Sequence, residues 1–354
     1  MKKILAAVAV IVLLFCFYRF SQPGHPPQPD QPTPVAPPAQ VAIRSQSKSP
    51  APSNPFLDSE AVHNLRAAVA SGNEEAINNA VAGLAQYLAE HPGDTQYFLD
   101  ALASEKDEPM FGALAKGFAQ TDALMKNSGF LKSLANLASQ SSPDQRQHIL
   151  LNCLASAQQI DADMLEAITR IGANDSQSPV QTSAVALLAN WMHRFTDDSG
   201  VLSEKLGKIL DTSTDRTVRA FCYQLLASHR DALPREQQEN LLKYFKTEND
   251  PVLGNSIAVA LSAASSELRG DAVAYLHAVY QAEKSDIKRR YLLAQIACLE
   301  GPDALPFLKE ESRGTTTLAK DAAQHLSLLA QGGANAESFF LVLNSNAPPD
   351  VAEH

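Results

Sequence analysis

Residues 215–226 read Asp-Arg-Thr-Val-Arg-Ala-Phe-Cys-Tyr-Gln-Leu-Leu, and they show most clearly the pattern from which the fold is predicted. Asp215 is a residue type that caps helix starts, and it stands three positions before Val218. Apolar residues then follow at Cys222, Tyr223 and Leu226, which is the spacing that lines one face of an α-helix. The stretch therefore predicts an amphipathic helix that begins just after Asp215.

The same pattern recurs along the chain at steps of 31 to 38 residues. We call the place of Val218 the register position, and its occupants are Ala76, Met110, Arg146, Val180, Val218, Val252, Ile287 and Leu318. Five residues later every position is apolar, and eight residues later only Gln295 interrupts the apolar column. Helix-start signals precede the register position, with N-cap candidates at Asn73, Asp107, Asp215 and Asn249 and prolines at Pro109, Pro179 and Pro251.

A second, shorter set of apolar patterns lies between these helices. It predicts helices near residues 96–103, 130–139, 164–171, 202–210, 237–245, 268–282 and 304–310, with a leading helix over 57–70 and a closing one near 338–343 that would lie across the last repeat. Two helices per unit predict an all-α fold, an α-solenoid of about eight two-helix repeats of roughly 35 residues over residues 56–345. Residues 346–354 would form a polar C-terminal tail.

The stretch 215–226 resembles the second half of a HEAT-like repeat, in which an Asp, two residues and Val-Arg precede small and leucine positions. Residues 249–252 and 285–289 are weaker copies, and the resemblance covers roughly residues 57–345. It implies a curved stack of helix pairs. Tetratricopeptide repeats share the period and remain an alternative, although their Trp, Gly, Tyr and Pro positions are not reproduced in register.

Composition and charge exclude several classes of protein. The chain is 45% apolar but only 6% aromatic, which argues against a disordered chain and against a β-sandwich. Only one long apolar run exists, so a multi-span membrane protein is excluded. Residues 1–55 carry +4 and the remainder −14 of the net −10, so the body would repel phosphate backbones and we expect no nucleic-acid partner.

Residues 1–21 are predicted to target the chain to a membrane. Lys2 and Lys3 precede an apolar run over residues 4–18, which is followed by bulky residues rather than the small ones that signal peptidase prefers. We therefore expect an uncleaved single-pass anchor in a bacterial inner membrane, with the body in the periplasm. A cleaved, secreted form and a lipoprotein lipidated at Cys16 are the alternatives.

Residues 22–55 hold eleven of the chain's 21 prolines and almost no large apolar residue. Such a stretch cannot bury a core, so it predicts a disordered linker. At about 3.1 Å per residue in polyproline II conformation, it would reach roughly 100 Å. Residues 26–38 could alternatively serve as a proline-rich ligand for a groove-type domain.

We find no sequence pattern for catalysis, for a cofactor or for a metal. Phosphate-cradling loops and nucleophile elbows do not occur, and no two cysteines have metal-ligand spacing. Cys153, Cys222 and Cys298 are expected to be small buried hydrophobes. Structural or surface roles, at helix ends or exposed flanks, are expected for His193, His229, His277 and His325.

Two clusters are candidates for contact with a partner. Trp191, the only tryptophan, stands near Arg194, and both residue types are enriched at binding hot spots. The alternative is that Trp191 and Phe195 fill a helix crossing. Lys288, Arg289 and Arg290 form a short basic cluster in an acidic body, with a solvated helix start as the alternative.

These observations favour a non-catalytic, membrane-tethered scaffold or adaptor that binds a protein or peptide through one face of the repeats. An adaptor predicts an apolar or charged stripe on one surface. A passive spacer of the cell envelope, the first alternative, predicts a uniformly mixed surface. A lyase-like or other enzyme, the second, predicts a deep pocket where His or Cys meets a carboxylate.

Overall fold

The computed structural model describes residues 54–141, 144–174, 178–332 and 335–345, and every regular element in these ranges is helical. The predicted anchor in residues 1–21, all but the last two residues of the predicted linker, and the tail over 346–354 lie outside the described residues. Within the described ranges, none of the helices has the length and apolar character needed to span a membrane.

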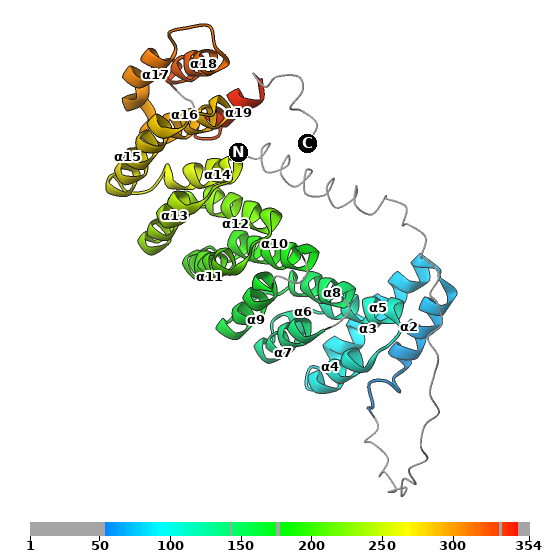
Figure 1. Cartoon of the computed structure of the whole chain (residues 1–354). Coiled ribbons are helices and arrows are strands. Elements are labelled where there is room, and N and C mark those ends of the chain that lie inside the picture. The colour runs from blue at the N-terminus through cyan, green and yellow to red at the C-terminus, as the bar shows by residue number, and fades with distance from the viewer. Residues whose placement is uncertain (1–53, 142–143, 175–177, 333–334, 346–354) are drawn as a thin grey trace, which may run out of the picture. The chain divides into compact units, whose positions relative to one another are not determined.

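Most helices form pairs along the chain (Figure 1). The first helices of the pairs are α2 (Glu60–Ser71), α4 (Thr95–Ser104), α7 (Ser128–Gln140), α9 (Ala162–Ala173), α11 (Ser199–Thr212), α13 (Arg235–Thr247), α15 (Ser266–Ala282) and α17 (Leu305–Glu311). The second helices are α3 (Glu74–Glu90), α5 (Glu108–Ala119), α8 (Asp144–Leu154), α10 (Ser178–Arg194), α12 (Arg216–Ser228), α14 (Pro251–Leu261), α16 (Asp286–Glu300) and α18 (Thr317–Gln331).

The pairs stack into two layers. Each second helix packs against the next, from α3 through α18, and the first helices from α4 through α15 do the same. Each pair thus completes its core against its neighbours, which is the arrangement of an α-solenoid. The all-α prediction is confirmed, and the predicted second set of helices matches the first-helix layer within a few residues.

Two further α-helices, α6 and α19, lie outside the pairs. The helix α19 (Ser338–Ser345) packs across α16 and α18, as expected for the closing segment. The sequence analysis missed α6 (Asp122–Met125), a single turn that contacts α3, α5 and α7. Its four residues are too few for a helical period to be visible in the sequence.

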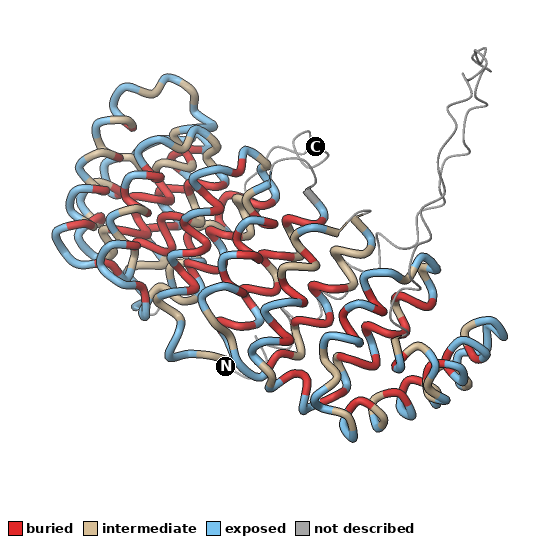
Figure 2. Tube along the Cα trace, turned by 90° about the horizontal axis from the view of Figure 1, so that it is seen from below, coloured by how far each residue is buried: buried red, intermediate tan, exposed pale blue. Residues whose placement is uncertain are grey.

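Buried residues recur helix after helix through the array (Figure 2). The apolar columns predicted five and eight residues after the register position are buried from α3 through α14, as Val81, Ala115, Leu151, Val185, Tyr223 and Ile257 and as Leu84, Phe118, Leu154, Leu188, Leu226 and Ala260. These side chains fill the space between the layers. Burial of aliphatic side chains therefore supplies the main stabilisation of the stack.

The spacing from cap to register position is one residue shorter than predicted in three of the later repeats. The N-cap of α14 is Asp250 rather than Asn249, and the N-caps of α16 and α18 are Ser285 and Thr316. Each stands two residues before the register position instead of three. Val252 and Ile287 are 44% and 58% exposed at that position, whereas Leu318 is buried.

In the last two repeats the column five residues after the register position also fails, since Leu292 is half-buried and Ala323 is exposed. The other predicted starts are confirmed. The side chains of Asn73, Asp107 and Asp215 accept hydrogen bonds from the backbone N–H three residues later.

Gly117 in α5 permits a close contact between helices and offers a direct test. A Cβ atom at Gly117 would lie 2.5 Å from Leu84 Cδ2, whereas one at Gly83 would meet nothing within 4 Å. We expect Gly117→Ala to lower the free energy of unfolding by about 1–3 kcal/mol through overpacking. Gly83→Ala, the control, should raise it by up to about 1 kcal/mol because alanine favours the helix. Equal thermal melts of the two variants would contradict this contact.

Candidate functional site

Four successive second helices, α8, α10, α12 and α14, carry almost no charge beyond their first turn. In α8, α10 and α12, the only charged residue beyond the first turn is Arg194, at the end of α10, and α14 contains none. Their polar groups are instead neutral amides, with Asn152, Asn190 and Gln224 exposed and Asn255 half-buried. We call the surface formed by α8, α10, α12 and α14 the uncharged face.

The first helices α9, α11 and α13, which pair with α10, α12 and α14, have the opposite character. α9 carries three charged residues, α11 four and α13 five, and most of these side chains are exposed. Several are joined in ion pairs between neighbouring helices, such as Lys205 with Glu166 at 3.2 Å and Arg235 with Glu267 at 3.0 Å. Charge is therefore distributed unevenly, and depletion of charged residues is the compositional mark of interface cores.

A cavity of about 320 Å³ with a mixed polar and apolar lining lies at one end of the uncharged face, between α14 and α19. Val252 and Val259 line it from α14 and Phe340 and Leu343 from α19, together with Asn255, Ser256, Tyr291 and Glu337. Leu341, the residue after Phe340, is 68% exposed. The uncharged face thus ends at a cavity that offers both apolar and polar contacts.

The structure separates the first pair of predicted partner-binding residues. Trp191 in α10 is 0% exposed. It therefore packs in the core, as the alternative interpretation proposed, and is not part of the surface. Arg194 is exposed, but its guanidinium donates hydrogen bonds to the carbonyls of Ala155 and Ala157, the latter at 2.6 Å. It therefore closes the end of the preceding second helix, α8.

The basic cluster also divides. Arg290 is 8% exposed and forms an ion pair with Asp321 of α18, so it lies in the interior instead of on a docking patch. Arg289 stacks 4.5 Å above the ring of Tyr280 and pairs with Glu311 at 3.4 Å. Lys288 is exposed at the edge of a second cavity.

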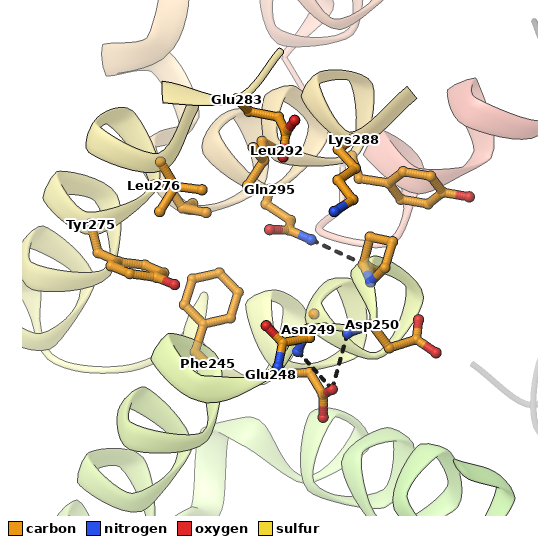
Figure 3. Close-up of a pocket in the computed structure, with 14 residues that line it drawn as sticks. Phe245, Glu248, Asn249, Asp250, Tyr275, Leu276, Glu283, Lys288, Leu292 and Gln295 are labelled. Atoms are coloured by element: carbon orange, nitrogen blue, oxygen red, sulfur yellow. Dashed lines mark hydrogen bonds between the residues drawn. The ribbon is translucent and has the colours of Figure 1, made fainter. Parts of the chain in front are cut away.

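The second cavity, which the sequence analysis missed, measures about 160 Å³ and lies between the pair α13–α14 and the pair α15–α16 (Figure 3). Gly254, Glu283 and Gln295 line it together with the rings of Phe245 and Tyr275. One sequence pattern marks the edge of this cavity, where Glu283 lies. A glutamate stands two residues before the N-cap of three second helices, at Glu105, Glu248 and Glu283.

His325 is the clearest error of the sequence analysis among the histidines. It was expected at a helix end or on an exposed flank, but it lies within α18 and is 0% exposed, and neither ring nitrogen has a hydrogen-bond partner among the described residues. Phe339 of α19 lies 5.9 Å away between ring centroids, and Asp321 stands one turn earlier on α18. Burial lowers the pKa of His325 to about 4.

This shift makes the C-terminal repeat sensitive to acid. The neutral imidazole is favoured in the folded state, so its stability is complete above the unfolded pKa near 6.5 and is lost as the pH falls toward 4. Between pH 7.5 and 5.0 the loss should be about 2 kcal/mol. Hydrogen-exchange protection of α16, α18 and α19 should fall accordingly in the wild type and much less in His325→Leu. The same decline in His325→Leu as in the exposed control His63→Leu would contradict it.

The three cysteines in the described ranges, Cys153, Cys222 and Cys298, are buried and unpaired, as expected. Burial raises the pKa of Cys153, Cys222 and Cys298 to about 12, so none is a thiolate nucleophile at neutral pH. His277 pairs with Glu300 at 2.7 Å, but neither residue lines the cavities described above. In the described ranges, no group of three or more His, Cys, Asp or Glu side chains is placed to hold a metal ion.

Comparison with known proteins adds little. No protein-family model matches the chain, and no curated protein does either. A solved structure described as "Computational Design of Self-Assembling Cyclic Protein Homooligomers" has 14% sequence identity and a TM-score of 0.14, and the match covers 77% of this chain and 89% of that one. A similarity of this size carries no argument about function or assembly.

Proposed function

We propose that this chain is a non-catalytic, membrane-tethered adaptor of the bacterial periplasm, which binds a protein or peptide partner through the uncharged face. Its helix pairs would be HEAT-like repeats, held to the membrane by residues 1–21 and spaced from it by the proline-rich linker. The single observation that carries the proposal is the difference in charge between α10, α12 and α14 and the first helices paired with them, α9, α11 and α13.

The uncharged face suits a polypeptide partner for a physical reason. Exposed amides such as Asn152, Asn190 and Gln224 can both donate and accept hydrogen bonds, so they match the paired N–H and C=O groups of a backbone. Little charge has to be desolvated when such a surface is covered. A passive spacer has no need for this asymmetry, since a uniformly mixed surface would serve it equally well.

Site-specific photo-crosslinking in cells tests the binding surface. A photoreactive residue at Asn190 or Gln224 should give a discrete crosslinked product, and one at the exposed positions Lys208 or Glu239 of the first-helix layer should not. Mass spectrometry then identifies the partner. Equal yields from both layers, or no discrete product from either, would refute the adaptor.

A reporter fusion tests the tether separately. A reporter that is active only in the periplasm, fused after residue 55, should be active and should sediment with membranes. Activity of a cytoplasmic reporter at the same junction would overturn the proposed topology. Release of the fusion into the soluble periplasmic fraction would instead favour cleavage of the leader.

A further inference from the structure

Two second helices place an arginine at their fourth residue, and in both it pairs with a glutamate at the end of the next first helix. Arg219 of α12 donates to Glu248 at 2.6 Å and to the hydroxyl of Tyr223 at 2.8 Å. It also reaches the carbonyls of Leu210 and Ser213 at the end of α11. The guanidinium thereby joins three helices at the corner between consecutive repeats.

The second example is Arg289 of α16. Its guanidinium carbon lies 4.5 Å from the ring centroid of Tyr280, and it pairs with Glu311, the last residue of α17. The shared elements are therefore an arginine from the first turn, a tyrosine, and a glutamate from the following repeat. Planar guanidinium groups suit such sites because they pair with carboxylates and stack on aromatic rings.

The helix between these two, α14, has Gly254 at its fourth residue, so it supplies no side chain to the corresponding corner. The glutamate is nevertheless present. Glu283 directly follows α15, and its Oε1 accepts hydrogen bonds from the backbone N–H groups of Lys284 and Ser285, both at 2.8 Å. Glu248 makes the same two backbone bonds to Asn249 and Asp250, and its other oxygen binds Arg219.

The cavity of about 160 Å³ occupies this corner. It extends from Gly254 to Glu283, and the rings of Phe245 and Tyr275 form its aromatic wall, with centroids 6.3 Å apart (Figure 3). Among the described residues, no ion pair within 4.0 Å is formed by Glu283. The backbone amide of Ser285 is the main cause that holds the pKa of Glu283 below its usual value, so its carboxylate is ionised at neutral pH.

Gln295 and Lys288 also line the cavity. Gln295 reaches in from α16 and donates to Asn255 Oδ1 at 2.9 Å, so its amide forms the floor below Gly254. Lys288 is the one cation that lines the cavity, and it stands at the edge, where it is exposed. It also helps to keep Glu283 ionised, but as a compact ammonium it cannot stack on the aromatic wall as a guanidinium does.

We infer that the cavity at Gly254 binds a guanidinium group, supplied by an arginine side chain of the partner polypeptide, which pairs with Glu283 and stacks on Phe245 and Tyr275. The inferred contact rests on the proposed adaptor function for its source. The partner's arginine would complete the arrangement that Arg219 and Arg289 complete within the chain.

The probe for this site is Nα-acetyl-L-arginine amide, titrated into the chain from residue 22 onward while backbone and tyrosine-ring NMR signals are followed. For a ligand of this size, we expect saturable shifts around Gly254, Glu283 and Tyr275 with a Kd on the order of 1 mM. The uncharged analogue Nα-acetyl-L-citrulline amide should bind at least tenfold more weakly. Equal binding of both probes, or no saturable shift, would overturn the proposal.

Four variants, of which Asp271→Asn is the control, show which groups hold the probe. Glu283→Gln, which keeps the acceptor for the backbone, should weaken binding at least tenfold, whereas Asp271→Asn, an exposed charge change in the same helix α15, should leave it unchanged. Gly254→Arg should fill the site and abolish binding in a chain that keeps its helical CD spectrum. Lys288→Gln should bind the probe as tightly or more tightly. Loss in Lys288→Gln, or unchanged affinity in Glu283→Gln, would overturn the inference.

The crosslinking experiment keeps the two proposals apart. A discrete partner captured from Asn190, combined with a failed arginine titration, would refute the guanidinium site alone. Specific arginine binding without any crosslinked partner would support the guanidinium site and refute the adaptor function.

Discussion

Replacing Leu188 with Asp is expected to unfold the helix pairs around α10. Leu188 is 0% exposed between the layers, so the change removes a buried leucine and places an unpaired carboxylate in its position. Loss of the leucine alone should cost about 2–5 kcal/mol, and burial of the charge adds to it. Because each pair is stabilised by its neighbours, the loss should spread to α8 and α12.

A far-UV CD melt measures this effect. We expect Leu188→Asp to lose the cooperative transition or to shift it far below that of the wild type. Asn190→Asp is the matched control, since it makes a similar charge change two residues later at an exposed position and should alter stability by no more than about 0.5 kcal/mol. A wild-type melt for Leu188→Asp would refute the helical register.

The second large effect is expected at the buried ion pair between α16 and α18. Arg290 is 8% exposed and Asp321 is 0% exposed, and Arg290 also donates to the carbonyl of Leu343 in α19 at 3.2 Å. Asp321→Asn would leave the guanidinium buried without its counter-charge. Removal of one partner from a buried pair typically costs about 3–5 kcal/mol, so the last repeats should lose much of their protection.

Hydrogen exchange followed by mass spectrometry locates this loss. Peptides from α16, α18 and α19 should exchange faster in Asp321→Asn, and those from α5 and α8 should not change. Glu310→Gln, which breaks an exposed pair with Arg313, should cost less than about 1 kcal/mol. The double variant Arg290→Met with Asp321→Leu should recover most of the protection, because apolar replacements of buried ion pairs are often neutral. Unchanged exchange in Asp321→Asn would contradict a structural role for the pair.

Local signals predicted most of the helix boundaries. An N-cap such as Asp107 or Asp215 acts on amides three residues away, and the apolar spacing that follows it acts within one helix. At α14 the predicted cap, Asn249, was wrong, because it was placed by its spacing from Val252. The cap is Asp250, whose carboxylate accepts hydrogen bonds from the backbone N–H groups of Val252 and Leu253.

The candidate sites depended on contacts between repeats, which short-range patterns do not report. The basic cluster at residues 288–290 looked uniform in sequence, but Arg290 faces α18, Arg289 faces α17 and Lys288 faces solvent. The same limit applies to His325. Its burial depends on α19, which begins thirteen residues later and closes over α18.

Capping signals and helical periodicity are local properties, so they were enough to predict that the body of this chain is a series of helix pairs. Which charges are paired, and the cavity at the point where α14 has Gly254 in place of an arginine, become visible once the pairs are stacked. These features arise when side chains from different repeats meet. Their distances depend on how the pairs stack, and the order of residues within one pair does not specify them.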